Sequence, residues 1–206
     1  MPKKKPNKRW LQEQNTDIYV KQARDSHYRS RAVYKLQEID KKDKLLRHGA
    51  CVVDLGAAPG SWSQYAAERV GESGRVIAVD LLEMEPIMHV HILQGDFTET
   101  ETEQLLLATL AQRQVDLVIS DMAPNLTGIR DTDQARSLAL AELVLYFCQR
   151  ALKPGGDLLI KLFEGAGTNE FRQQLREHFK QVLTRKPGAS RDKSREFYVL
   201  ARSYAL

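Results

Sequence analysis

The chain has 206 residues, 42% of them hydrophobic, and a formal net charge of +4. This length suits one domain with a full core, and no apolar run is long enough for a membrane-spanning helix, which excludes a helical membrane protein. No apolar segment follows the charged residues 1–5, so we expect no secretory signal. Cys51 and Cys148 have no motif spacing and the five histidines form no metal-ligand pattern, so we expect a cytoplasmic protein with reduced cysteines and no metal.

The charge is distributed unevenly along the chain. Residues 1–47 hold 14 Lys and Arg against 6 Asp and Glu, and residues 172–195 hold 8 against 2, so both segments are strongly basic. Residues 48–171 between them hold 8 Lys and Arg against 18 Asp and Glu. A single charged run is usually a solvated surface, but two basic regions that could meet in space favour a polyanionic partner such as nucleic acid.

In chain order, residues 1–16 are rich in Lys, Asn and Gln and predict a flexible basic arm. Two predicted helices, 17–25 and 30–46, then open a single domain over 17–206, of which 17–46 is the N-terminal helical part and 50–206 the core. Strand and helix patterns alternate from residue 50. The predicted strands are 50–55, 75–80, 89–94, 115–121, 156–163, 179–185 and 196–203, and the predicted helices are 60–70, 99–112, 132–152 and 168–178.

This alternation predicts an α/β fold with one doubly wound, seven-stranded, mostly parallel sheet. The stretch Lys153-Pro154-Gly155-Gly156 predicts a helix stop before the fifth strand. The last two strands are joined by residues 186–194, which is too short for a parallel crossover, so we expect the last strand to be antiparallel. Its beginning, at Arg195 and Glu196, then lies at the sheet edge where ligands of such folds bind.

A glycine-containing turn follows the apolar residues Cys51-Val52-Val53, in the stretch Asp54-Leu55-Gly56-Ala57-Ala58-Pro59-Gly60-Ser61-Trp62. It predicts a buried strand that breaks into a tight turn and restarts as a helix, so that a ligand can lie against bare backbone and meet helix N-terminal amides. Pro59 would stiffen the turn and suits the first turn of a helix. Gly56 and Gly60 are four residues apart, which is not the dinucleotide spacing and favours a smaller nucleoside with a zwitterionic tail. Two glycines alone would be weak evidence, because such turns are common.

Carboxylates end three successive predicted strands. Asp80 closes the second strand and could accept hydrogen bonds from both hydroxyls of a ribose. Asp96 follows the third strand, where it could meet the amino group of a base, and Asp121 ends the fourth. Each alone is most simply a turn or cap residue. Together, beside the glycine turn, they indicate a ligand with a ribose, an exocyclic amine and a positive charge.

Lys161 stands inside an apolar strand, where lysine is unusual. Its head could simply reach water, or desolvation and a neighbouring cation could lower its proton affinity for catalysis. Glu196 and Asp121, expected at the same sheet edge, could hold and orient it. By composition alone Lys35 is a solvated helix lysine and Glu196 a strand-end charge.

Together these residues resemble the FtsJ/RrmJ family of S-adenosylmethionine-dependent RNA ribose 2′-O-methyltransferases. The resemblance covers the chain from about residue 17 to the C-terminus. It is carried by Ser30-Arg31-Ala32-Val33-Tyr34-Lys35-Leu36, by Asp54 to Trp62, by Asp121-Met122-Ala123-Pro124 and by the strand that contains Lys161. One departure is Ser61, where relatives often have a second glycine, and serine suits a helix start.

The resemblance implies a Rossmann-like methyltransferase fold, S-adenosyl-L-methionine as cofactor, and two sets of site residues. The implied catalytic tetrad is Lys35, Asp121, Lys161 and Glu196, and the implied cofactor contacts are Gly56, Gly60, Trp62, Asp80, Asp96 and Asp121. In the expected reaction a ribose 2′-hydroxyl attacks the sulfonium methyl carbon in line. Lys161 is the proton acceptor or orients the hydroxyl lone pair, Lys35 helps to keep it partly neutral, and the two carboxylates position both lysines.

The implied partner is RNA, and the resemblance points to a uridine in the A loop of 23S ribosomal RNA within the large subunit. Residues of the two basic segments would contact phosphates: Arg29, Arg31, Lys186, Arg191, Lys193 and Arg195. Looped or single-stranded RNA is the expected target, because base-specific recognition of RNA favours loops. We expect a monomer that does not bind membranes.

Three alternatives remain open at this point. A transfer RNA or messenger-cap 2′-O-methyltransferase of the same family is disfavoured by the short chain without added domains. A non-catalytic RNA-binding assembly factor is disfavoured by the complete tetrad. A nicotinamide-dependent oxidoreductase is disfavoured by the glycine spacing with Pro59.

Overall fold

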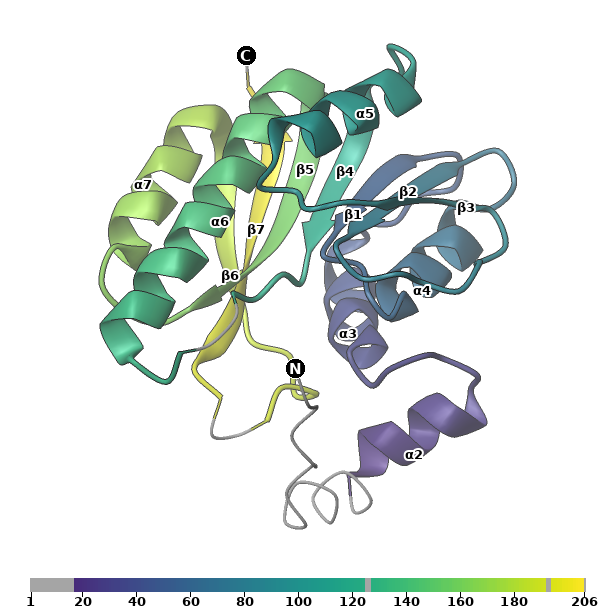
Figure 1. Ribbon diagram of the computed structural model, residues 1–206, viewed down its shortest axis with the longest axis horizontal. Coiled ribbons are helices and arrows are strands. Elements are labelled where there is room, and N and C mark those ends of the chain that lie inside the picture. Colours follow the sequence, from purple (N-terminus) through teal and green to yellow (C-terminus); the bar gives the residue numbers. More distant parts are fainter. Residues whose placement is uncertain (1–16, 125–126, 192–193, 206) are drawn as a thin grey trace.

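The computed structural model describes residues 17–124, 127–191 and 194–205, and its centre is a seven-stranded sheet (Figure 1). The strand order is β3-β2-β1-β4-β5-β7-β6. The strands are β1 Cys51–Leu55, β2 Arg75–Asp80, β3 Val90–Gln94, β4 Val115–Ser120, β5 Leu152–Phe163, β6 Phe179–Arg185 and β7 Glu196–Tyr204. The order reverses between β1 and β4, where doubly wound folds bind their ligands at the carboxyl ends of the strands.

Helices cover both faces of the sheet. They are α2 Ile18–Asp25, α3 Val33–Asp43, α4 Ser61–Val70, α5 Thr100–Leu110, α6 Arg130–Ala151 and α7 Thr168–His178. One core lies under α5, α6 and α7 and includes Leu106, Phe147 and Phe171, and a second lies under α3 and α4 and includes Leu36 and Ala66. Because both faces are buried, β1 is buried along its whole length and shows no alternation of polar residues.

Local sequence explains where the N-terminal helices begin and end. Asp17 caps α2 by accepting a hydrogen bond from the amide of Tyr19 at 3.0 Å. In α3 the side chains of Leu36 and Ile39, three residues apart, are buried against the sheet. That helix ends at Asp43 and is followed by the C-cap residue Lys44, which adopts a left-handed conformation with φ of 55°. The predicted second helix, 30–46, is therefore shorter in the structure, and the predicted arm over 1–16 lies outside the described residues.

The last strand confirms the expected antiparallel direction. β7 runs antiparallel to both β5 and β6 and lies between them. Glu196, its first residue, pairs with Phe163 at the carboxyl end of β5, so the start of β7 lies at the ligand-binding edge. The insertion of β7 between its two sequence predecessors was not predicted, because the length of a connection gives its direction but not the neighbour that it joins.

The fifth strand begins earlier than the sequence indicates. Helix α6 ends at Ala151, one residue before the expected end at 152, and β5 starts directly at Leu152 and includes Pro154, Gly155 and Gly156. Its pairing with β4 is irregular there, since Val115 pairs with Leu152 and Leu117 with Asp157. The Pro-Gly-Gly stretch therefore forms an irregular start of the strand rather than a separate loop.

Cys51 and Cys148 are free and buried, as predicted for core residues. Over the residues that the structure describes, none of the helices has the length and apolar character needed to cross a bilayer.

Candidate active site

The turn after β1 is shaped for close approach at Gly56. This residue has a φ of 75°, and a Cβ built on it would lie 2.2 Å from Cγ of Met122 and 3.1 Å from its Cα. The adjoining amide of Ala58 donates a hydrogen bond of 2.8 Å to the carboxylate of Asp80, which ties the turn to the end of β2. The Ala58–Pro59 peptide bond is cis. Only glycine fits at position 56, because a side chain there would meet both unfavourable backbone geometry and neighbouring atoms.

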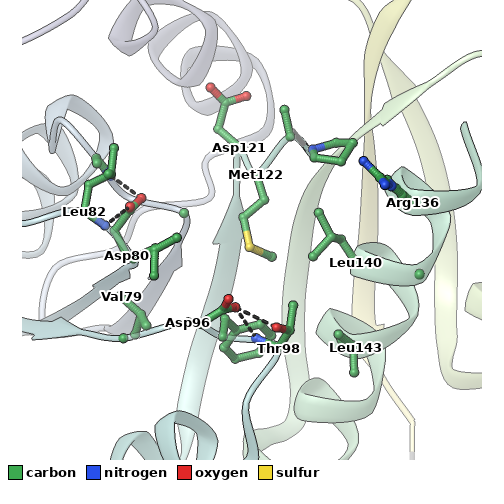
Figure 2. Close-up of a pocket in the computed structure, with 18 residues that line it drawn as sticks. Val79, Asp80, Leu82, Asp96, Thr98, Asp121, Met122, Arg136, Leu140 and Leu143 are labelled. Carbon is green, nitrogen blue, oxygen red and sulfur yellow. Dashed lines mark hydrogen bonds between the residues drawn. The ribbon is translucent and has the colours of Figure 1, made fainter. Parts of the chain in front are cut away.

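A cavity of about 620 Å³ opens over this turn. Asp80, Asp96 and Asp121 all line it, so the structure brings together the three predicted strand-end carboxylates. Figure 2 shows Met122 in the middle of the cavity, between the Asp80 side and α6. Helix α6 contributes the opposite wall, which sequence reasoning missed, through Arg136, Ala139, Leu140 and Leu143.

Two of these carboxylates are fixed by the backbone around them. Asp80 accepts a second hydrogen bond, of 2.8 Å, from the amide of Leu82. Asp96 accepts hydrogen bonds from the amide of Thr98 at 2.9 Å and from its hydroxyl at 2.7 Å, and these bonds lower the pKa of Asp96 (Figure 2). Both carboxylates are therefore oriented by the protein itself, and the Asp96 carboxylate is held in its charged form.

Two residues implied as cofactor contacts do not line this cavity. Trp62 is 2% exposed, packs against Tyr198 in the core with 5.7 Å between ring centroids, and donates from Nε1 to the carbonyl of Ala32 at 2.8 Å. Gly60 lies under Arg29 and Ile87, and a Cβ there would be 2.6 Å from Cδ1 of Ile87. The structure gives both residues a packing role, because Trp62 joins α4 to the segment before α3 and Gly60 admits the neighbouring loop. Pro59 precedes the N-cap Gly60 and so lies before the first turn of α4 rather than within it.

A fourth carboxylate, Asp54, is buried in β1 beneath the turn. Its Oδ2 accepts a hydrogen bond of 2.6 Å from the hydroxyl of Ser63, while its Oδ1 has no partner among the described residues. Burial, together with the charges of Asp121 and Asp80, raises the pKa of Asp54 to about 7, although the Ser63 bond opposes this shift. A buried carboxyl group with one unsatisfied oxygen favours its protonated form.

The implied tetrad is assembled as two ion pairs at the carboxyl edge of the sheet. Lys161 Nζ lies 3.1 Å from Oδ1 of Asp121 and donates a hydrogen bond of 2.5 Å to the Asp121 carbonyl. The Lys161 side chain is only 8% exposed, so its ammonium does not reach freely into water. Because Asp121 also lines the cavity, this lysine is held directly beside it.

The second pair joins Lys35 of α3 to Glu196 of β7, with 2.6 Å between Nζ and Oε1. Burial alone would raise the pKa of Glu196, but the hydrogen bond and charge of Lys35 and the charge of Lys161 outweigh it and lower this pKa. The sequence led us to expect that Lys35 acts on Lys161 through like-charge repulsion. In the structure each lysine instead has a carboxylate of its own.

Tyr198 is a site residue that sequence reasoning missed. Its hydroxyl donates a hydrogen bond of 2.7 Å to Oδ1 of Asp121, and its ring lies 5.9 Å from Nζ of Lys35. It therefore contacts both ion pairs. Burial and the neighbouring Asp121 raise its pKa well above the usual value, so the hydroxyl stays protonated and remains a donor. The signal was present in the strand alternation, since Tyr198 is two residues from Glu196 and pairs across the sheet with Lys161.

Known proteins resemble this chain in sequence and in fold. FtsJ-like methyltransferases match residues 28–204 of the chain. The chain belongs to this family. Proteins named ribosomal RNA large subunit methyltransferase E share 54% identity in Alkalilimnicola ehrlichii, 52% in Pseudomonas aeruginosa and 49% in Legionella pneumophila. These matches cover 99%, 99% and 100% of this chain and 98%, 99% and 100% of the relatives.

A solved structure is also similar to this chain over most of the length of both proteins. It is a crystal structure described as a ribosomal RNA methyltransferase from Plasmodium falciparum, with a TM-score of 0.76 and 30% sequence identity. The match covers 86% of this chain and 98% of that one. The FtsJ-like fold thus extends over nearly all of the residues that form the sheet and the two ion pairs.

In this methyltransferase, helix α3 is fixed to the last part of the chain. Glu38 accepts hydrogen bonds from the amides of Gly188 and Ala189 at 2.7 and 3.0 Å. Asp43 binds the guanidinium of Arg185 through two bonds of 2.6 and 2.7 Å, which lower the pKa of Asp43. These contacts set the position of Lys35 relative to the start of β7, since Lys35 lies on the same helix.

Two arginines implied to contact RNA are occupied within the methyltransferase. Arg29 donates hydrogen bonds to the carbonyls of Pro59, Glu85 and Pro86 at 2.8 to 3.1 Å. It thereby connects the loop after β2 to the glycine turn. Arg31 forms an ion pair with Asp17 and donates to the carbonyl of Ala189. Both hold the N-terminal segment against the sheet, because their donors already bind carbonyl and carboxylate oxygens.

The other implied RNA contacts surround the β6–β7 connection. Lys186 donates to the carbonyls of Ser194 and Glu196 and so ties the two ends of this connection together. Arg191 and Arg195 are exposed. Lys193 lies outside the described residues.

Proposed function

We propose that this methyltransferase uses S-adenosyl-L-methionine to methylate a ribose 2′-hydroxyl in large-subunit ribosomal RNA. The observation that carries the proposal is the position of Lys161. Its amine is held by Asp121, which itself lines the acid-lined cavity, and the pair of Lys35 and Glu196 lies at the same edge of the sheet. A reacting hydroxyl that enters from the surface would meet this amine beside the cavity.

The cavity suits the proposed cofactor in size and chemistry. A volume near 620 Å³ is within the range of small-molecule sites, and its floor is kept open by the absence of a side chain at Gly56. Asp80 would bind the ribose hydroxyls, Asp96 the amino group of the base and Asp121 the positively charged methionine end. When bound, this cofactor supplies a methyl group attached to a positively charged sulfur.

The protein must then place the hydroxyl and remove its proton. In this proposal Lys161 accepts that proton in its neutral form, and Asp121 and Tyr198 hold Lys161 in position. The pair of Lys35 and Glu196 fixes the edge of the sheet beside it. Alignment of two reactants can contribute about 7–11 kcal/mol in favourable cases, so positioning by the tetrad contributes alongside proton removal.

The choice of substrate is supported by the relatives, which are named as ribosomal RNA large subunit methyltransferases and match this chain over almost its full length. We infer the same substrate here and, within it, a uridine of the 23S A loop. We further propose that the protein acts as a monomer in the cytoplasm.

The decisive test is transfer of tritiated methyl groups to large subunits from cells that lack this protein, followed by mapping of the modified nucleotide. We expect one 2′-O-methylated uridine in the A loop. Labelling of transfer RNA with none in large subunits would support the alternative substrate. Tight RNA binding without any transfer would support an assembly factor, and a fluorescence response to NADH would support an oxidoreductase.

A further inference from the structure

A second cavity lies on the other side of the tetrad. It has a volume of about 530 Å³, and Glu196 lines it while Asp121 lines the first cavity. We call this second cavity the basic groove. It is lined by the cations Arg130, Lys186 and Arg195, by the acids Glu164 and Glu196, and by Phe197, among others. The two ion pairs therefore lie between an acid-lined cavity and a groove in which cations outnumber acids.

The cations of the groove come from separate parts of the chain. Arg130 is the first residue of α6, and Arg195 directly precedes β7. Both are exposed, and within residues 17–124, 127–191 and 194–205 no ion pair or side-chain hydrogen bond involves either guanidinium. Lys186 is tethered to the start of β7 through the Ser194 and Glu196 carbonyls and so contributes a fixed charge.

The acids of the groove do not neutralise these arginines. Glu196 is paired with Lys35 at 2.6 Å, and Glu164 lies 3.8 Å from Arg172. The backbone around Arg195 is fixed, since its carbonyl accepts a hydrogen bond of 3.1 Å from the amide of Glu164. Two exposed guanidiniums thus border a concave surface next to the catalytic edge.

We propose that Arg130 and Arg195 bind the phosphodiester groups that flank the target ribose. The inference rests on the proposed function and extends it to the residues that fix the RNA strand. A guanidinium presents a planar fork of donors that matches two phosphate oxygens, whereas a lysine offers only a point charge. A strand held in this groove places its ribose against Glu196, at the edge of the tetrad that faces away from the first cavity.

Helix α6 links this groove to the cofactor cavity. Arg130 lines the groove at its start, while Arg136, Leu140 and Leu143 line the cavity further along. One helix therefore borders both binding surfaces. A phosphate bound by Arg130 would lie at a fixed position relative to the cavity wall that the same helix forms. This arrangement favours Arg130 as part of the substrate site, in addition to the basic residues near β7.

The test compares Arg130→Gln and Arg195→Gln with Arg176→Gln, a matched change of an exposed arginine in the last turn of α7. Methyl transfer to large subunits and to an A-loop RNA is measured over a range of salt concentrations, and cofactor affinity is measured by calorimetry. We expect each groove variant to raise the KM for RNA about tenfold and to reduce the slope of log affinity against log salt by about 0.7. Cofactor affinity should stay within about twofold of the wild type.

Arg130→Lys should recover part of the affinity, because it restores the charge without the planar fork. Groove variants that behave like Arg176→Gln would overturn the phosphate assignment while wild-type methylation persists. Absence of methyl transfer by the wild type would instead refute the proposed function, so the two failures can be told apart.

Discussion

The tetrad and the acid-lined cavity proposed to bind the cofactor share one edge of the sheet but are built in different ways. The cavity is formed mainly by residues at or just after the ends of β1, β2, β3 and β4, and α6 forms its opposite wall. The tetrad joins α3, β5 and β7 with the end of β4, and its Lys35–Glu196 pair spans 161 positions of sequence. The cavity therefore depends on local turns, whereas the tetrad depends on the whole topology.

This difference predicts separable effects of mutation. Changes in the glycine turn should alter cofactor binding and leave the tetrad in place. Changes in the tetrad should alter turnover and leave cofactor affinity nearly intact. The following experiments are ordered from the largest expected effect to the smallest.

Lys161→Ala should lower kcat by about 10²- to 10⁴-fold, because it removes the proposed proton acceptor. The matched control is Lys153→Ala, since Lys153 pairs with Asp116 between the same two strands but at their opposite end. The control should retain nearly full activity. Cofactor affinity, measured by calorimetry, should be nearly unchanged in both variants. Unchanged turnover in Lys161→Ala would remove this residue from the mechanism.

Gly56→Ala should weaken cofactor binding at least tenfold, since its Cβ would lie 2.2 Å from Met122. Gly155→Ala is the matched control, because Gly155 also has a positive φ, of 80°, but nothing lies within 4 Å of its added Cβ. The control should lose only about 1 kcal/mol of stability from the unfavourable backbone conformation. Equal cofactor affinity in the two variants would show that contact with Met122 does not matter.

Tyr198→Phe tests whether the two ion pairs act together. It removes the 2.7 Å hydrogen bond to Asp121 and should cost about 1 kcal/mol of stability. We expect kcat to fall several-fold while the affinities for cofactor and RNA are retained. Tyr146→Phe, on the exposed surface of α6, is the control for loss of a hydroxyl. A fall in RNA affinity without a change in kcat would argue against a positioning role.

The last prediction concerns pH and Asp54, where the expected effect on catalysis is the smallest and the measured quantity is stability. Its pKa is raised to about 7 by burial and nearby carboxylates, from 3.8 for an ordinary aspartate. The folded state therefore holds its proton more tightly than the unfolded state, and this contribution to stability is lost as pH rises from about 4 through 7. Between pH 5 and pH 8 the free energy of unfolding should fall more in the wild type than in Asp54→Asn, as measured by urea denaturation. Parallel pH dependences would contradict this assignment.

Most of the fold could be predicted from the sequence because its signals are local. Apolar runs and turn residues placed the ends of β2 and β6 at the positions that the structure shows. The short β6–β7 connection gave the direction of β7. The order of β5, β7 and β6 could not be predicted, because it depends on which faces pack together over long distances in the chain.

The same holds for the site. Residues marked by a local sequence pattern were predicted, whereas contacts between distant parts of the chain were not. Asp80, Asp96 and Asp121 were found from their strand ends and do share one cavity. The burial of Trp62 against Tyr198 was missed, because a motif does not tell which side of a helix faces a ligand. The hydrogen bonds from Arg29 to three backbone carbonyls were not predicted either. Those oxygens belong to loops whose positions follow only from the assembled fold.

The central position of β7 has a consequence for how this enzyme matures. Glu196 and Tyr198 lie on the last strand, which enters a slot between two strands made before it. As the chain emerges from the ribosome, all residues that line the first cavity, the last of which is Leu143, are made well before this strand. The tetrad is therefore completed only when this last strand takes its place in the sheet and Glu196 pairs with Lys35.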